Sequence, residues 1–359
     1  MLIANFADLH ARGKDLEAFE AQWTAGLREA IARNARAIVI AGDIFDRPNV
    51  GDNYASTGAI ARAVISPLIV EVPQDVPILA AVGNHDLASG AAVDALTLLE
   101  ALPNAWVFRH AEWFEHLDGY DRVQILFFPW RWGAESTPFE DVTEALASLG
   151  GPLDSPSLLV GHVQVKGAAL DNGMNSPGGS WTITQKELYS LPFDRIALGD
   201  YHRRQDLTGR GTYVGALRQL GFGQEGHPAG FELWNSGSGE TEWVELGIAP
   251  RHRTVTLKSQ LATLPEPEDG EILRIICDGF TPNLAEARRI EATGRARFEV
   301  IANADERVSS AACEESGRQL AAAMTPHKAL DTWAKGQVAP PTPTDLSRLR
   351  ALACNIIQA

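Results

Sequence analysis

Short apolar runs alternate with amphipathic stretches along the first 130 residues. The runs at residues 2–7, 37–41 and 77–82 have the length and apolar character of buried strands. Between and after them, apolar side chains recur every three or four positions, as they do on one face of a helix. The helices that this spacing predicts span residues 15–34, 53–70 and 93–102. The alternation predicts an α/β protein whose strands are covered on both faces.

Later apolar runs predict that the sheet structure continues beyond residue 200. Strands are expected at residues 124–128, 157–160 and 195–198. Two more, at residues 212–215 and 230–234, are expected to be antiparallel and to lie at sheet edges.

The chain after residue 250 has a separate organisation. A turn-forming stretch at residues 264–270 precedes a strand, helix, strand pattern, which predicts a small second domain. The Pro-rich residues 338–344 predict a stiff linker before a final helix at residues 345–357. The expected domains are a main domain at residues 1–250, a small α/β domain at residues 251–337, and a linker with a C-terminal helix at residues 338–359.

Polar residues of the kinds that bind metals follow five of the expected strands directly. The five motifs are Asp8-Leu9-His10, Gly42-Asp43 with Asp46, Gly83-Asn84-His85-Asp86, Gly161-His162, and Gly199-Asp200-Tyr201-His202. Each motif alone is common in surface turns, but open α/β sheets place their active sites at the carboxyl ends of strands. The conjunction of five motifs therefore predicts a single site.

The residue types in these motifs indicate the chemistry of that site. Imidazole, carboxylate and amide ligands without thiolate suit two borderline or hard divalent ions and do not suit a structural zinc. A carboxylate that bridges two ions about 3.5–4 Å apart is the arrangement used for in-line phosphoryl hydrolysis.

Charge and cysteine content narrow the class of protein. The 359 residues carry a net charge of −15, and the first 250 hold 17 basic and 32 acidic residues. This excess argues against a protein that coats nucleic acid by bulk charge, while a local basic groove stays open. The three cysteines are far apart and indicate reduced thiols. With neither a signal peptide pattern nor an apolar run of about 20 residues, a cytoplasmic protein with no membrane segment is expected.

The five motifs resemble those of the calcineurin-like metallophosphoesterases. Within that superfamily, the stretches IALGDYHRRQ (196–205) and YVGALRQLGFGQEGHPAGFEL (213–233) are similar to the SbcD-type DNA repair nucleases and their phage recombination relatives. The resemblance covers most of residues 1–245. It implies an α/β fold, a metallophosphoesterase sandwich of mixed β-sheets flanked by helices, with a small α/β capping domain at residues 251–337.

The resemblance also assigns roles to individual residues. The implied ligands are Asp8, His10 and His202 for one ion, Asn84, His162 and Asp200 for the other, and Asp43 bridging both. His85 would act beside the ions as an acid or phosphate-orienting group. Asp46 would hold the His85 ring, which fixes its tautomer and favours its charged form.

The last motif departs from the pattern of most relatives, which have Gly-His-x-His where this chain has Gly199-Asp200-Tyr201-His202. A carboxylate can still coordinate, but it makes the site harder and more anionic. Two Mn²⁺ ions are therefore the expected cofactor, with Mg²⁺ as the alternative and zinc disfavoured.

Several basic residues stand next to the motifs and could bind substrate phosphates. These candidates are Arg12, Arg47, Arg131, Arg203 and Arg204, with Lys14 and Arg218 nearby. Ordinary solvated surface is the alternative for each of them. Trp130 and Trp132 flank Arg131, where packing is favoured over base stacking.

The resemblance implies a two-metal DNA phosphodiesterase in repair and recombination, an exonuclease on double-stranded ends and an endonuclease on single strands. It would be a homodimer that serves as the nuclease subunit of an SbcCD-like complex, with an SMC-like coiled-coil ATPase bound through the C-terminal segment. One alternative is a calcineurin-like phosphodiesterase for small nucleotide substrates, which would need no second domain. Another is a degenerate, non-catalytic scaffold subunit, which the complete ligand set disfavours.

Overall fold

The computed structural model describes residues 1–301 except 49, 88–94, 120, 151–152, 154–155, 171–173, 208, 248–249 and 260. The chain divides into two compact units. One contains residues 1–254 and 266–274, and the other contains residues 255–265 and begins again at residue 275. The expected linker and helix at residues 338–359, and residues 302–337 of the expected capping domain, lie outside the described residues.

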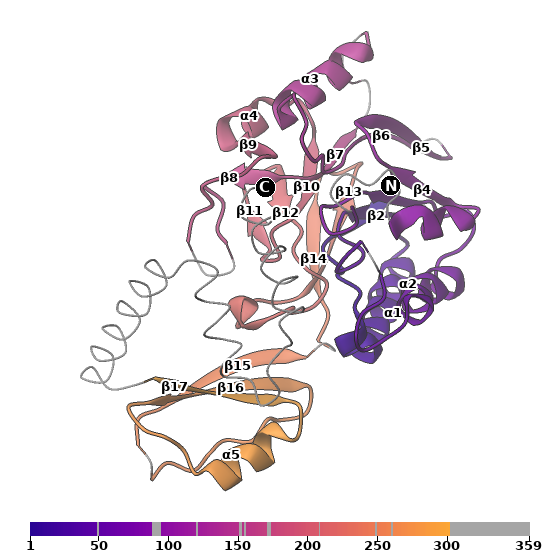
Figure 1. Cartoon of the computed structure of the whole chain (residues 1–359). Helices are drawn as coiled ribbons and strands as arrows, with labels where there is room; N and C mark the ends of the chain where they lie inside the picture. Colours follow the sequence, from indigo (N-terminus) through magenta and orange to yellow (C-terminus); the bar gives the residue numbers. More distant parts are fainter. Residues whose placement is uncertain are drawn as a thin grey trace, which may run out of the picture. The chain divides into compact units, whose positions relative to one another are not determined.

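Two mixed six-stranded sheets form the first unit (Figure 1). The first sheet has the order β14-β13-β1-β2-β3-β4. Its strands are β1 (Leu2–Phe6), β2 (Ala37–Ala41), β3 (Ile78–Ala81), β4 (Ala105–Phe108), β13 (Gly230–Asn235) and β14 (Thr241–Glu245). The second sheet has the order β11-β12-β10-β7-β6-β5. Its strands are β5 (Glu112–Asp118), β6 (Asp121–Phe128), β7 (Ser157–His162), β10 (Arg195–Gly199), β11 (Gln205–Asp206) and β12 (Gly211–Tyr213).

Strand direction decides where the motifs come together. In the first sheet, β1, β2 and β3 are parallel, so that Ala4 lies beside Ile38. In the second sheet, β6, β7 and β10 are parallel, so that Leu159 lies beside Ile196. Parallel neighbours end at the same edge of a sheet, which places the motifs after β1, β2 and β3 together and those after β7 and β10 together.

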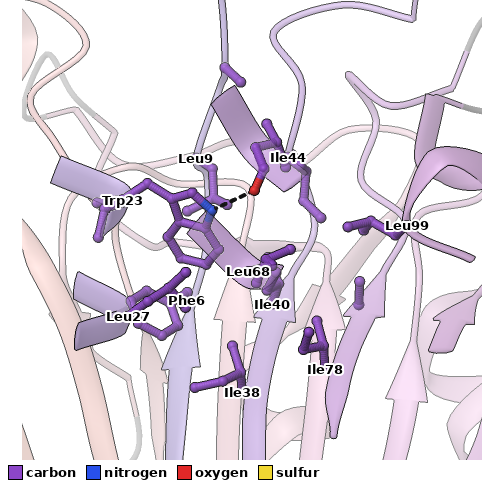
Figure 2. Packing of buried hydrophobic residues seen from close by; sticks show 14 of the residues in the cluster. Phe6, Leu9, Trp23, Leu27, Ile38, Ile40, Ile44, Leu68, Ile78 and Leu99 are labelled. Atoms are coloured by element: carbon purple, nitrogen blue, oxygen red, sulfur yellow. Dashed lines mark hydrogen bonds between the residues drawn. The ribbon is translucent and has the colours of Figure 1, made fainter. Parts of the chain in front are cut away.

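The two sheets pack face to face, and helices cover their outer faces. Every second residue of β2 shows the division: Val39 packs in the cluster shared by both sheets, whereas Ile38 and Ile40 pack under the helices. Figure 2 shows this outer cluster, where Trp23 and Leu27 lie against strand residues. The buried indole N–H of Trp23 donates to the backbone oxygen of Val64, 3.1 Å away, which ties the two covering helices together.

The covering helices fall into two groups, one for each sheet. Beside the first sheet lie α1 (Leu16–Ala32), α2 (Thr57–Glu71) and the short η2 (Ala95–Ala101), and Figure 1 shows α1 and α2 side by side. Beside the second sheet lie α3 (Pro138–Ser148), α4 (Gln185–Ser190) and the small sheet of β8 (Gln164–Lys166) and β9 (Thr182–Thr184). The short 3-10 segments η1 (Gly13–Asp15) and η3 (Phe222–Gln224) lie in loops. The predicted fold of mixed sheets flanked by helices is confirmed.

Several sequence-based expectations were wrong in detail. The expected α-helix at residues 93–102 is a 3-10 helix where the structure describes it. The strand β12 is parallel to β10 and is covered by β11, so it is neither purely antiparallel nor an edge. The strand β13 is antiparallel as expected, but it lies between β1 and β14. Helices α3 and α4 were not predicted, although each begins with a capping box, Thr137 with Glu140 and Thr184 with Glu187.

The second unit takes part in a three-stranded sheet of order β15-β16-β17, with one described helix. Its elements are β15 (Arg251–Leu257), β16 (Glu271–Asp278), α5 (Leu284–Glu291) and β17 (Ala296–Ile301). The strand, helix, strand pattern after residue 270 is thus observed, and Ala287 and Ile290 of α5 pack on Leu264. Within the described ranges, every helix is too short or too polar to cross a bilayer.

Candidate metal centre

The five motifs meet around one carboxylate at the carboxyl ends of the parallel strands. Oδ2 of Asp43, after β2, lies 3.5 Å from Nε2 of His10 and 3.4 Å from Nε2 of His162. His10 comes from the first sheet and His162 from the second. Nε2 of His10 also lies 3.2 Å from Nε2 of His202, after β10. A single carboxylate oxygen therefore faces imidazoles from both halves of the fold.

The remaining expected ligands lie beside this core. Oδ1 of Asn84 is 2.8 Å from Nε2 of His162, and Oδ1 of Asp200 is 3.8 Å from the same nitrogen. Within three groups, the ligand atoms all lie within 4.8 Å of one another. These groups are Asp8, His10 and His202; Asp8, Asp43 and His162; and His10, Asp43 and His85. The structure thus brings together all seven residues expected to bind metal, and it places His85 close enough to serve as a ligand as well.

The donor atoms fit divalent cations. Asp8, Asp43 and His162 are almost fully buried, and Oδ2 of Asp8 and Oδ2 of Asp200 find no hydrogen-bond partner among the described residues. A buried carboxylate oxygen without a donor is costly unless a cation meets it. Burial opposes a charged imidazole, yet the Asp43 carboxylate raises the pKa of His162 to about 10. A metal ion bound beside Asp43 would supply positive charge in place of that proton.

The backbone at the centre has an unusual conformation. Among the described residues, four of the five non-glycine residues with positive φ belong to the centre. They are Asp8 (50°), His10 (45°), Asp43 (53°) and Asp200 (103°). Such conformations cost about 1–3 kcal/mol each and persist where the surroundings enforce them. Gly83 is required for space, because a Cβ there would lie 2.2 Å from Oδ1 of Asp43.

Residues 1–203 match the family model of the calcineurin-like phosphoesterases, and this range contains all seven expected ligands. The chain belongs to the calcineurin-like phosphoesterase family. The family binds two divalent metal ions, and the groups described above are candidates to hold them. The expected superfamily and the metal-dependent phosphoesterase class are confirmed.

Two solved structures that are similar to this phosphoesterase have low sequence identity to it. A purple acid phosphatase from yellow lupin (Lupinus luteus) seeds is 12% identical with a TM-score of 0.40, over 68% of this chain and 52% of that chain. A protein of unknown function from Aquifex aeolicus is 14% identical with a TM-score of 0.26, over 51% of this chain and 88% of that chain. The chain thus spans about half the length of the lupin phosphatase. No curated protein sequence matched.

Asp86 of the phosphoesterase holds two ligand loops together, a role that sequence reasoning missed. Its buried carboxylate accepts from the backbone N–H of Phe45 and of Gly83, both at 3.0 Å, and of Ile44 at 3.4 Å. The first two donors lie in different loops, one after β2 and the other after β3. Asp86 therefore positions the Asp43 loop against the Asn84 loop. The Gly-Asn-His-Asp motif contained the residue, but only the fold shows which N–H groups it accepts from.

Arg218 of the phosphoesterase holds the backbone of the loop after β1, which carries Asp8 and His10. Its side chain is fully buried, although the sequence places it among candidates for a phosphate-binding surface. One NH2 donates to the backbone oxygen of His10 at 2.8 Å, while another pairs with Asp15. Arg218 thus connects the segment after β12 with the motif after β1.

The contact between Asp46 and His85 differs from the expected one. Nδ1 of His85 lies 2.8 Å from the backbone oxygen of Asp46, and not against its carboxylate. The carboxylate lies instead 3.6 Å from Nδ1 of His10 and 3.8 Å from the Arg12 guanidinium, whose positive charge complements that of the carboxylate. His85 is exposed, and its backbone N–H donates to Oδ1 of Asp43 at 2.8 Å.

The candidate substrate-binding arginines differ in how firmly protein groups hold them. Four are held in place: Arg12 by Asp15, Arg131 by Asp141, Arg203 by the backbone oxygen of Leu170, and Arg204 by Asp206. Arg47 is the most exposed of the five, with a side chain 56% accessible and 3.6 Å from Asp46. Arg47 is thus the most accessible of the five arginines, and it lies beside Asp46, whose backbone oxygen contacts His85.

Proposed function

We propose that the chain is a DNA phosphodiesterase, an exonuclease on double-stranded ends and an endonuclease on single strands, and the nuclease subunit of an SbcCD-like complex. The observation that supports this most directly is the position of the segment that resembles SbcD-type nucleases. Arg218 of that segment donates to the backbone of His10, and the N–H of Ala216 donates to the backbone oxygen of His202 at 2.9 Å. The resembling residues are therefore part of the framework of the metal centre.

The proposed reaction is hydrolysis of a phosphodiester. Two divalent ions, most simply Mn²⁺, would be held by Asp8, His10 and His202 and by Asn84, His162 and Asp200, with Asp43 shared. When bound, such ions activate water and stabilise negative charge on the phosphoryl oxygens.

The His85 ring is oriented for proton transfer or phosphate binding. A backbone carbonyl can only accept, so Nδ1 must donate its hydrogen to the oxygen of Asp46. This leaves Nε2 for the substrate. In the charged ring Nε2–H can give a proton to the leaving oxygen or donate a hydrogen bond to a phosphoryl oxygen, whereas in the neutral ring Nε2 can only accept.

The direct test compares three substrates with Mn²⁺ and the full chain. We expect hydrolysis of bis-p-nitrophenyl phosphate, shortening of linear duplex DNA and cutting of circular single-stranded DNA, all lost in Asp43→Ala. Hydrolysis of the small diester without cleavage of either DNA would contradict the proposal and favour the small-nucleotide alternative. No hydrolysis of any substrate with both ions bound would favour the scaffold alternative.

The proposal includes a cytoplasmic homodimer and an SMC-like coiled-coil ATPase bound through residues 338–359. The support is the Pro-rich linker and apolar helix pattern in that sequence. Deleting residues 338–359 should leave diester hydrolysis intact and weaken co-purification with the ATPase. Undiminished co-purification would place the docking surface elsewhere in the chain, and sedimentation of the full chain would test the dimer.

A further inference from the structure

We propose that Trp132 stacks against a nucleobase of the substrate at the entrance to the metal centre and so selects nucleotide-containing phosphodiesters. The proposal deepens the proposed function and rests on it, because it names the part of the substrate that the protein recognises beside the phosphate.

Ring contacts lead from a metal ligand to this exposed side chain. The His162 and Trp130 rings lie 6.2 Å apart between centroids, at an interplanar angle of 72°. The Trp130 and Trp132 rings lie 5.4 Å apart at 68°. Trp130 is buried, with 4% of its surface accessible, whereas Trp132 is 48% accessible. The exposed indole is therefore one ring removed from a residue of the centre.

The loop that carries Trp132 is fixed to the centre. It follows β6, which is parallel to β7, the strand that ends in His162. The backbone N–H of Trp130 donates to the oxygen of Val82 at 2.9 Å, just before the Gly83-Asn84 motif. A tryptophan has only two side-chain torsions, so a fixed backbone leaves a contact surface that costs little entropy to immobilise.

The neighbouring Arg131 is directed to other partners. Its guanidinium pairs with the mostly buried Asp141 and lies 5.9 Å from the centroid of the Trp181 ring. The expectation that Arg131 binds substrate phosphate stays a prediction. In this loop the Trp132 ring is therefore exposed, whereas the Arg131 guanidinium forms an ion pair within the protein.

Stacking suits the charge of this protein. A chain with a net charge of −15 gains little from long-range attraction of a polyanion. An aromatic platform binds a base through its π-face without any charge, and every nucleobase offers such a face. The affinity that Trp132 supplies should therefore be insensitive to salt.

Trp106 provides a matched control within the same unit. It is 44% accessible and also packs on an aromatic ring, with its centroid 5.5 Å from that of Phe114. It lies on β4, in a strand that carries none of the metal-ligand motifs. The two residues thus share exposure and aromatic packing, and they differ in proximity to the centre.

The experiment compares two chromogenic diesters with the same leaving group, thymidine 5′-p-nitrophenyl phosphate and methyl p-nitrophenyl phosphate. The wild-type chain with Mn²⁺ should prefer the thymidine ester in kcat/KM. In Trp132→Ala this preference should shrink by about 5- to 100-fold, mainly through KM. Trp132→Phe should keep most of the preference, and Trp106→Ala should keep all of it. The ratio should change little between 50 and 300 mM salt.

Three results would overturn the proposal: no preference in the wild-type chain, an undiminished preference in Trp132→Ala, or equal losses on both esters. Assays on DNA with the same variants separate this outcome from that of the proposed function. If DNA is cleaved but Trp132→Ala keeps the base preference, the stacking role fails and the nuclease stands. If DNA is not cleaved but the preference depends on Trp132, the nuclease fails and the stacking role stands.

Discussion

The two sheets contribute to the metal centre in different ways. In the first sheet, Asp8, His10 and Asp43 all adopt positive φ. Buried side chains hold these loops from outside the ligand set: Asp86 fastens the loops after β2 and β3, and Arg218 holds the backbone of His10. The first-sheet ligands are therefore strained, and buried side chains from outside the ligand set hold their loops.

In the second sheet one ligand, Asp200, has positive φ (103°). His162 is the last residue of β7 and keeps an extended strand backbone, and its Nδ1 bonds to the backbone oxygen of Ala41, in β2 of the first sheet, at 2.8 Å. The Asp200 backbone N–H donates to the carboxylate of Asp8 at 3.1 Å. The second-sheet ligands His162 and Asp200 are thus positioned by hydrogen bonds to groups of the first sheet. Substitutions in the first-sheet loops should therefore weaken the binding of both metal ions, whereas substitutions of second-sheet ligands should weaken mainly one of them.

The largest expected effect comes from the shared carboxylate. Asp43→Ala removes the oxygen that faces both His10 and His162, so both ions should be lost and hydrolysis should fall by more than about 100-fold. His162→Ala should weaken mainly the ion of the second set. Metal content after gel filtration in Mn²⁺, with turnover of bis-p-nitrophenyl phosphate, measures both effects. Activity above roughly a tenth of wild type in Asp43→Ala would refute the shared role.

The next effect separates catalysis from metal binding at His85. His85→Ala should keep both ions, because seven other residues hold them, while turnover falls by roughly 10²–10⁴-fold. Anomalous scattering or calorimetry would count the ions. If His85 is an acid, the deficit should shrink on a p-nitrophenyl ester, whose leaving group needs no proton. Loss of an ion from this variant would instead make His85 a ligand, as its distance to His10 and Asp43 permits.

The ligands could be predicted from sequence because each one directly follows an apolar strand. Asp8, Asp43 and His162 are local features of this kind, and the parallel strand order brings them together. The supports are not local. Arg218 and His10 are 208 positions apart in the sequence. The residues next to Arg218 in the sequence do not distinguish a buried arginine from one on a phosphate-binding surface.

The second sheet was predicted less completely than the first. Its outer strand β5 (Glu112–Asp118) mixes charged and aromatic residues, and half-buried strands of this kind give weak apolar runs. The capping boxes at Thr137 and Thr184 would have revealed both missed helices. The parallel direction of β12 depends on its pairing with β10, which short sequence segments do not encode.

A smaller effect tests whether the first-sheet support is specific to the centre. Asp86→Ala leaves three buried backbone N–H groups without their acceptor and should weaken Mn²⁺ binding by about 10–100-fold. The control is Asp194→Ala, at an exposed residue. The Asp194 carboxylate also accepts a backbone N–H, from Ser157 at 2.9 Å, but at the opposite end of β7. The control should lower Tm without changing Mn²⁺ affinity. Equal losses of affinity in both variants would show that the support acts only through general stability.

The smallest effect contrasts the histidines of the two sheets. Burial lowers the pKa of His10, whereas the Asp43 carboxylate, against the effect of burial, raises the pKa of His162 to about 10. At pH 8 the metal-free protein therefore holds a proton on His162 that Mn²⁺ must displace, and binding should release roughly one proton from this group. Burial raises the pKa of Asp200 to about 7, so Asp200 is also protonated at pH 6. Binding of Mn²⁺ at pH 6 should therefore release a second proton. Since protons compete with the metal, Mn²⁺ affinity should rise with pH over this range. Calorimetric titration in buffers of different ionisation enthalpy counts the protons, and an enthalpy at pH 8 that is independent of the buffer would contradict the assignment of the charged imidazole to the second sheet.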